Sequence, residues 1–142
     1  IQCAPHFHNL AVHAGAERVG ATVVPISAGN TALQIQTMID FKSTVLCCTP
    51  SYAMYLGELA AELGYKPGDF KLRIGLFGSE GCTTDLRAKI EQRLGLFATD
   101  NYGMSELIGP GVSGECEYRC GLHFAEDHFL PEIVDPETLE AK

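Results

Sequence analysis

The sequence lacks the apolar run of about 20 residues that a membrane-spanning helix needs, so no membrane span is predicted. Positive charge is scarce: 10 Lys and Arg stand against 18 Asp and Glu, which gives a net charge of -8 at pH 7. An acidic surface does not suit phosphate backbones or anionic lipid, so neither nucleic acid nor a membrane is an expected partner. No basic segment followed by an apolar stretch indicates a signal peptide. The 46% hydrophobic and 20% charged residues are typical of a globular protein.

The six cysteines do not indicate a disulfide framework. Cys47 and Cys48 are adjacent within an apolar run, which suits buried free thiols better than cross-links. Free thiols favour a reducing compartment, so we expect a cytoplasmic protein.

Segments with strand and helix patterns alternate along the first two thirds of the chain. Buried, β-rich runs precede segments with helical spacing, and glycines follow several of those helices. This alternation predicts an α/β fold made of βαβ units with a mostly parallel sheet. Pro25 places its strand at an edge or at its own end. The predicted strands are residues 21–27, 44–49, 71–77 and 96–100, and the predicted helices are 10–19, 31–41, 50–63 and 83–94.

The pattern changes after Tyr102. Residues 109–111, Gly-Pro-Gly, predict a break in the chain, and short β-like segments follow it. Residues 114–119, 121–125 and 128–134 predict the start of an antiparallel β meander, and residues 135–138 predict a turn. We therefore expect residues 1–108 to be the α/β part of one domain and residues 109–142 to be a truncated meander of that same domain.

Two polar, glycine-containing loops are predicted to follow the third and fourth strands. The first contains Gly78, Ser79 and Glu80, and the second covers residues 101–106. Ligands of open α/β sheets bind beyond the carboxyl ends of the strands, so both loops should border one cleft. In the second loop Tyr102 offers a flat face to a nucleobase, and Glu106 is the hard oxygen ligand that Mg²⁺ prefers.

The second loop also carries a family resemblance. Residues 102–106 read YGMSE and resemble the Y-G-x-[ST]-E motif of the adenylate-forming (acyl-CoA synthetase) superfamily. Through residue 138 the sequence continues LIGPGVSGECEYRCGLHFAEDHFLPEIVDPET, which closely resembles the phenylacetate–CoA ligases. Three earlier segments resemble the same family in the same order: GAERVGATVVPISAGNT, STVLCCTPSYA and LRIGLFGSE.

The resemblance implies an ATP-dependent, AMP-forming acid–CoA ligase that uses Mg²⁺. The carboxylate of an aryl acid, phenylacetate in this family, attacks the α-phosphorus of ATP, and the thiol of coenzyme A then displaces AMP. Such chemistry needs charge neutralisation and positioning rather than a protein nucleophile. By resemblance, Glu106 binds Mg²⁺ and Ser105 contacts phosphate. The implied nucleotide-binding residues are Gly78, Ser79, Glu80, Asp100, Asn101, Tyr102, Gly103 and Met104. Residues implied for the acid pocket are Phe7, His8 and Pro110, although the sequence around Phe7 and His8 departs from the family text.

The family's phosphate loop, its ribose-binding Asp and its catalytic Lys have no counterpart in these residues. The resemblance therefore implies an internal piece of a larger ligase, inactive alone. Apolar faces that missing segments would cover favour self-association, so a homodimer is a further expectation.

Two alternatives stay open from the residues alone. One is a related adenylating enzyme that loads a carrier-protein thiol. The other is a non-catalytic module that binds a nucleotide or zinc. Cys116, Cys120 and His123 could hold a structural zinc with a fourth ligand from the N-terminal residues, although their spacing is not that of a standard finger and free thiols are the simpler interpretation.

Overall fold

The computed structural model describes residues 2–3, 9–26 and 29–142. Within these ranges all named strands join one sheet in the order β2-β1-β3-β4-β5-β6-β7. The parallel part is made of β1 (Gln2–Cys3), β2 (Val24–Pro25), β3 (Val45–Cys48), β4 (Ile74–Gly78) and the first half of β5 (Phe97–Met104). β2 lies at the edge of this sheet, as Pro25 predicted. The predicted parallel α/β arrangement is confirmed.

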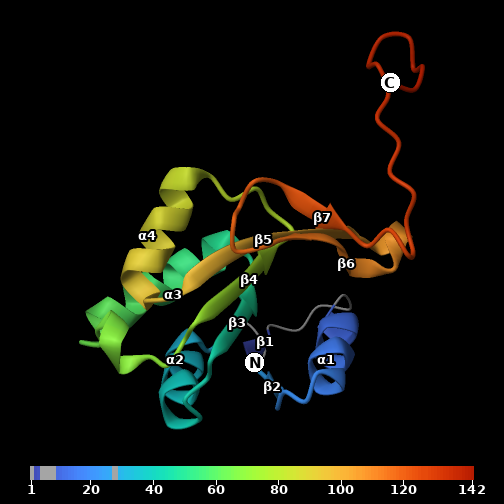
Figure 1. Ribbon diagram of the computed structural model, residues 1–142. Helices are drawn as coiled ribbons and strands as arrows, with labels where there is room; N and C mark the ends of the chain where they lie inside the picture. The colour runs from blue at the N-terminus through green and yellow to red at the C-terminus, as the bar shows by residue number, and fades with distance from the viewer. Residues whose placement is uncertain (1, 4–8, 27–28) are drawn as a thin grey trace.

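The helices follow the βαβ pattern. They are α1 (Asn9–Arg18), α2 (Thr31–Asp40), α3 (Pro50–Glu62) and α4 (Thr84–Leu94), with a short 3₁₀ turn, η1 (Pro67–Asp69), before β4. In Figure 1, α2, α3 and α4 gather on one side of the sheet and α1 lies apart from them. The core sits under the three gathered helices, where Ile35, Leu56 and Ile90 pack against Leu46 and Phe77 of β3 and β4.

Local signals explain where these helices begin and end. Thr49 and Thr83 cap α3 and α4 by accepting bonds from the N–H groups of Tyr52 and Leu86. Gly95 ends α4 in the left-handed conformation, with φ of 68°. α2 begins at Thr31, the first residue of the predicted helix 31–41, and Asn30 caps it, because Asn30 Oδ1 accepts the N–H of Leu33 at 3.1 Å.

The second half of the sheet is antiparallel, as predicted, but its segments differ from the prediction. β5 runs through Met104, and after the 3₁₀ turn η2 (Ser105–Leu107) the chain returns as β6 (Gly109–Glu115) and then β7 (Leu122–Phe124). Residues 101–104 are therefore strand rather than loop, because β6 pairs with them. The predicted break at residues 109–111 lies inside β6, where the pairing shifts register beside Tyr102 and Gly103.

The predicted strand over residues 128–134 does not form. The described part of this tail contains a single β-bridge, Val134 with Ala141, and the bends around Asp135 that the turn prediction anticipated. Figure 1 shows the tail leading away from the sheet, so no neighbouring strand is there to pair with it. Its apolar side chains stay exposed, with Leu130 at 88% and Ile133 at 74%. The β5–β6 hairpin spans residue 108, and the division of the chain at that residue remains a prediction.

Candidate nucleotide-binding site

The two segments singled out in the sequence lie side by side. β4 and β5 are neighbouring parallel strands, and Gly78 at the end of β4 pairs with Asn101 in β5. Ser79 follows with a φ of 67°, which turns the chain sharply out of the sheet. β5 continues past this point as the hairpin that carries Tyr102 to Glu106. The carboxyl ends of two adjacent strands therefore present both segments together, where ligands of α/β sheets bind.

Gly78 is required by close packing at this point. A β-carbon on Gly78 would lie 2.6 Å from the backbone oxygen of Asn101, closer than real β-carbons approach any atom. The amide of Asn101 donates to the carbonyl of Phe77 and to Thr99 Oγ1, both at 3.3 Å. Gly114 leaves room for that same amide, because a β-carbon there would lie 2.7 Å from Asn101 Oδ1. Asn101 thus packs closely against Gly78 on one side and Gly114 on the other, and neither position has space for a side chain.

Glu80 joins the β4 loop to the first turn of α3. Its carboxylate accepts the N–H of Ser51 at 3.2 Å and the hydroxyl of Ser51 at 2.8 Å. An acidic group at a helix N-terminus is favourable because the helix dipole places positive charge there. Glu80, which the resemblance assigns to nucleotide binding, is thus bonded to the start of α3.

Tyr102 and Met104 share one exposed face of β5. Their side chains are 45% and 39% exposed, and the Tyr102 hydroxyl donates to the sulfur of Met104 at 3.4 Å. Gly103 between them has no space for a side chain, because a β-carbon there would meet Gly109 O and would lie 2.6 Å from Pro110 Cα. β6 pairs with β5 at Gly103 through Pro110, within the sheet, and Tyr102 keeps an exposed face.

Ser105 and Glu106 occupy the turn between β5 and β6, and both are exposed. Ile108 closes this turn with φ of 77°, a left-handed conformation that a β-branched residue rarely adopts. Backbone strain of this kind gathers at functional sites. Glu106 thus stands on a turn held in an unusual conformation, with its carboxylate directed to solvent.

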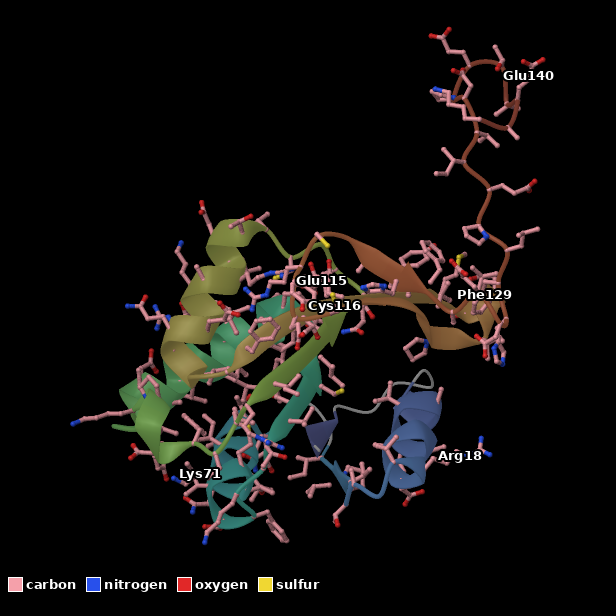
Figure 2. The ribbon with its side chains drawn as sticks, viewed as in Figure 1. Arg18, Lys71, Glu115, Cys116, Phe129 and Glu140 are labelled. Atoms are coloured by element: carbon pink, nitrogen blue, oxygen red, sulfur yellow. The ribbon has the colours of Figure 1, made fainter. Side chains whose placement is uncertain are left out.

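Pro110 lies in the wall of an open hollow of about 210 Å³. Leu107, Ile108 and Phe129 provide most of its apolar lining, and His128 is its polar member. Figure 2 places Phe129 at the hairpin end of β6, opposite Glu115. Phe7 and His8, the other predicted pocket residues, lie outside the described residues.

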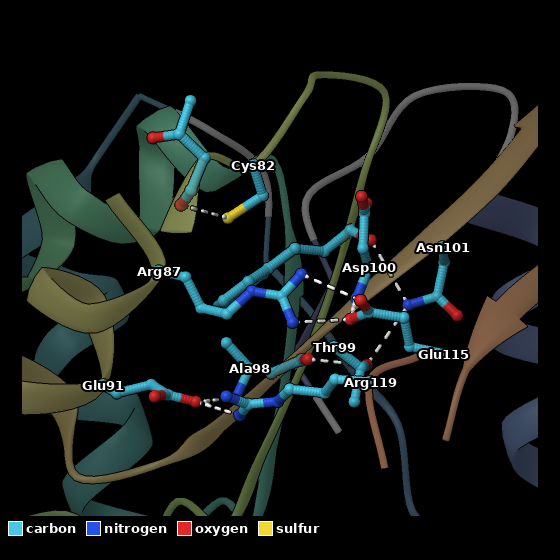
Figure 3. A network of polar contacts seen from close by, with 12 residues as sticks. Cys82, Arg87, Glu91, Ala98, Thr99, Asp100, Asn101, Glu115 and Arg119 are labelled. Carbon is cyan, nitrogen blue, oxygen red and sulfur yellow. Dashed lines mark hydrogen bonds and ion pairs between the residues drawn. The ribbon is translucent and has the colours of Figure 1, made fainter. Parts of the chain in front are cut away.

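A polar network that sequence reasoning missed runs along β5 (Figure 3). The carboxylate of Glu115 accepts the N–H of Asp100 at 2.8 Å, and Glu91 accepts the N–H of Ala98 at 2.9 Å. Each carboxylate is paired with an arginine: Glu115 with Arg87, and Glu91 with Arg119. The spacing of Arg87 and Glu91 places both on one face of α4, which is the one signal of this network in the sequence.

The network shifts the ionisation of its members. Burial raises the pKa of Glu115, but the hydrogen bonds from Arg87 and Asp100 outweigh it, so the pKa lies below its ordinary value of 4.5. The same pair raises the pKa of Arg87. Cys82 borders this pair, and burial raises the pKa of its thiol more than Arg87 lowers it. Cys82 follows a loop and precedes a helix, yet a raised pKa disfavours the thiolate form that reacts.

Cys116, Cys120 and His123 do not form a metal site here. Across residues 2–3, 9–26 and 29–142, no three His, Cys, Asp or Glu side chains come close enough together to hold an ion. Cys116 follows Glu115 at the end of β6, Cys120 is exposed, and His123 pairs with Gly114 within the sheet. The structure therefore gives no support to the zinc prediction. Among the described helices, none is long and apolar enough to cross a membrane.

Comparison with known families gives a match that spans the whole chain. Residues 1–142 match the family described as AMP-binding enzyme. Curated relatives include the phenylacetate-coenzyme A ligases of Pseudomonas putida, 50% identical over 132 residues, and of Escherichia coli, 49% identical over 129 residues. These alignments cover 92% and 89% of this chain but 30% of each relative. The chain thus spans about a third of the length of the curated relatives that it matches.

Solved structures give the same fold. A 2-hydroxyisobutyryl-CoA ligase, crystallised in an open conformation with 2-HIB-AMP and CoA, superposes with a TM-score of 0.89 at 26% sequence identity. The superposition covers 97% of this chain and 32% of that one. A long-chain-fatty-acid-CoA ligase from Archaeoglobus fulgidus shares the fold at a TM-score of 0.75 and 14% identity, covering 99% of this chain and 31% of that one.

Proposed function

Because the chain belongs to the family of AMP-binding enzymes, we propose that it forms the adenine- and acid-binding part of an ATP-dependent acid–CoA ligase. The observation that carries this proposal is the pairing of Gly78 with Asn101, which brings the β4 loop and the YGMSE hairpin to one end of the sheet. The acid proposed is phenylacetate or a similar aryl acetate, supported by four curated relatives at 46–50% identity that are named phenylacetate-coenzyme A ligases.

The reaction has two steps. The carboxylate of the acid attacks the α-phosphorus of ATP and displaces pyrophosphate, which gives an acyl-adenylate. The thiol of coenzyme A then attacks the acyl carbon, and AMP leaves. The name of the relatives favours coenzyme A over a carrier-protein thiol as the acceptor.

The exposed face of β5 suits the nucleotide. Tyr102 has an open ring face on which adenine stacks, and Asp100 and Asn101 precede it beside the adenine amino group. Gly78 and Ser79 form the facing wall, which Glu80 anchors to α3.

The hairpin turn suits the phosphates and the acid. Ser105 donates its hydroxyl to a phosphate oxygen, and Glu106 offers one exposed carboxylate. One carboxylate together with substrate phosphates is the ligand set that Mg²⁺ favours, so the residue present fits this ion. Mg²⁺ bound there neutralises charge on the phosphates. Gly103 and Met104 border the acyl group, and Pro110 lies in the hollow that an aryl ring would enter.

The experiment uses the full-length protein that contains this chain. AMP release is measured with ATP, Mg²⁺, coenzyme A and a panel of carboxylic acids, for the unchanged protein and for Glu106→Gln. We expect release that depends on phenylacetate and on coenzyme A, and a loss of about 100-fold or more in kcat for Glu106→Gln. Glu117→Gln, an exposed acid outside the turn, is the matched control and should retain activity. If no acid in the panel supports AMP release, the proposal is wrong.

Compartment and self-association are further parts of the proposal. Cys82, Cys116 and Cys120 are free thiols, which supports a reducing, cytoplasmic compartment. The exposed apolar side chains of the tail favour a homodimer of the isolated chain. Sedimentation analysis at two protein concentrations tests this, and a monomer at both would contradict it.

A further inference from the structure

We propose that Glu115, held by Arg87, is a positioning residue for nucleotide binding, because it sets where the backbone of β5 lies immediately before Asn101 and Tyr102. This inference rests on the proposed function. It concerns a carboxylate that lies outside the YGMSE motif and that no sequence pattern singled out.

The hydrogen bond from the N–H of Asp100 to the side chain of Glu115 lies where the sheet would otherwise have its next backbone hydrogen bond. β6 pairs with β5 at Tyr102 with Ser113 and at Asn101 with Gly114. The next pair in this register would be Asp100 with Glu115, but the pairing of the two strands ends before it. The side chain of Glu115 provides the hydrogen bond at that position, since its Oε2 accepts the N–H of Asp100 at 2.8 Å.

Glu115 is itself held in place from α4. Arg87 donates to both of its carboxylate oxygens, at 2.8 Å and 3.1 Å. The two side chains are 10% and 13% exposed, so the pair is largely shielded from water. Two parallel charged bonds fix the orientation as well as the distance of the carboxylate. α4 is in turn anchored to the core through the fully buried Ile90 and Leu94. A continuous connection therefore runs from the core to the backbone of β5.

β5 is thus held from both sides at Asp100 and Asn101. On the β4 side, Gly78 allows the backbone of Asn101 to approach so closely that a β-carbon would lie 2.6 Å from its oxygen. On the opposite side, Glu115 holds the preceding N–H. A binding constellation must be held within about 0.5 Å of its productive geometry, so loosening one restraint displaces the groups proposed to contact adenine.

The chain supplies a matched control two residues earlier on the same strand. Glu91 accepts the N–H of Ala98 at 2.9 Å, and Arg119 pairs with Glu91 while its guanidinium lies 3.7 Å from the centre of the Phe97 ring. Figure 3 shows the two carboxylate–arginine pairs one below the other along β5. In both pairs a glutamate bonded to an arginine accepts a β5 N–H, but Arg119 donates to one oxygen of Glu91, and this second pair is farther from Tyr102.

The test compares Glu115→Gln with Glu91→Gln in the full-length protein that contains this chain. Steady-state AMP release gives kcat and the KM values for ATP, acid and coenzyme A. Adenine contacts are made in both the ground and the transition state, so their misplacement raises KM for ATP. We expect Glu115→Gln to raise KM for ATP about tenfold, with KM for the acid and coenzyme A unchanged. Glu91→Gln should leave KM for ATP unchanged.

Arg87→Lys is the second variant, should Glu115→Gln fail to fold. It keeps a cation beside Glu115 but replaces two bonds by one, so we expect a smaller rise in KM for ATP. A purely structural role would lower the active fraction, and thus the apparent kcat, without a change in KM. An unchanged KM for ATP in Glu115→Gln or in Arg87→Lys overturns this proposal and leaves the proposed function standing. Equal rises in KM for ATP in Glu115→Gln and Glu91→Gln do the same. No acid-dependent AMP release by the unchanged protein overturns the proposed function and this inference with it.

Discussion

Gly78 of β4 and Asn101 of β5 lie so close together that a β-carbon on Gly78 would be 2.6 Å from the backbone oxygen of Asn101. A backbone atom cannot rotate away as a flexible side chain can. The approach of the two strands therefore depends on the absence of a side chain at residue 78. This contact also brings the two predicted ligand-binding segments to one end of the sheet.

We predict that Gly78→Ala separates β4 from β5 and destabilises the protein by about 1–3 kcal/mol. Chemical denaturation monitored by circular dichroism measures this change. Gly81→Ala is the matched control, because a β-carbon there has no heavy atom within 4 Å. Equal stability of the two variants would show that the strand approach does not need glycine at residue 78.

We predict that Glu80→Ala lowers stability by about 1 kcal/mol, because it removes the acceptor of the Ser51 N–H at the first turn of α3. Glu80→Gln should cost less, since the amide oxygen still accepts that bond. Thermal unfolding at low and high salt measures both variants, and salt should reduce the charge-dependent part. Glu62→Gln removes an exposed acid from the other end of α3 and should not destabilise. A cost for Glu62→Gln as large as that for Glu80→Ala would contradict the dipole argument.

The contact of Glu115 with Arg87 should make stability depend on pH. Hydrogen bonds from Arg87 and Asp100, with the charges of Arg87 and Arg119, outweigh burial and hold the pKa of Glu115 below its ordinary value of 4.5. A lowered carboxyl pKa stabilises the folded state above the unfolded pKa, and this stabilisation is lost as the pH falls through the folded pKa. The neighbouring Cys82 thiol is uncharged in this acidic range.

We therefore predict that Glu115→Gln lowers the free energy of unfolding by about 1–3 kcal/mol between pH 6 and 8. The difference from the unchanged protein should shrink progressively below about pH 4.5, because Glu115 becomes protonated there while the amide of the variant does not titrate. Urea denaturation at a series of pH values measures this difference. A difference that grows toward low pH would contradict the assigned sign.

Local signals in the sequence predicted the parallel half of the fold well. The start of the predicted helix 83–94, its stop at Gly95 and the edge position of Pro25 are properties of single residues or short segments. Because parallel neighbours present their carboxyl ends together, the proximity of the Gly78 and Tyr102 segments also followed from the pattern.

The parts that sequence could not predict depend on partners distant in the chain. Residues 101–104 belong to a polar, glycine-containing segment that predicts a loop, yet pairing with β6 makes them strand. Residues 128–134 have a β-like composition, but no strand of the described residues pairs with them, so they stay irregular apart from the bridge at Val134. The bond from Glu115 to the N–H of Asp100 joins residues 15 positions apart, which no helical or strand period reveals.

We predict that Cys82 reacts slowly with alkylating reagents at neutral pH, because burial raises the pKa of its thiol. Peptide mass spectrometry after timed iodoacetamide treatment measures each site. Cys120 is exposed and serves as the internal reference, and Cys82 should label roughly tenfold more slowly. In denaturing urea the two rates should become equal. Faster labelling of Cys82 than of Cys120 in the folded protein would identify it as an activated thiol.

The left-handed conformation of Ile108 gives the last prediction. A left-handed residue with a β-carbon costs about 1–2 kcal/mol, and Asn tolerates this conformation better than Ile. Ile108 is 71% exposed, so Ile108→Asn loses little burial and should stabilise the protein by about 0.5–1.5 kcal/mol. Ile133→Asn is the control, since Ile133 is 74% exposed and has no positive φ.

Thermal unfolding of the two variants measures the effect of the turn's backbone strain on stability. KM for the acid, measured in the full-length protein, tests whether this turn contributes to acid binding. Ile108 lines the hollow beside Pro110, so we expect Ile108→Asn to raise KM for the acid while it raises stability. Higher stability with unchanged KM would place the acid elsewhere than this hollow. Lower stability for Ile108→Asn than for Ile133→Asn would show that the left-handed turn is not strained, and that the Ile108 side chain holds the hairpin that presents Glu106.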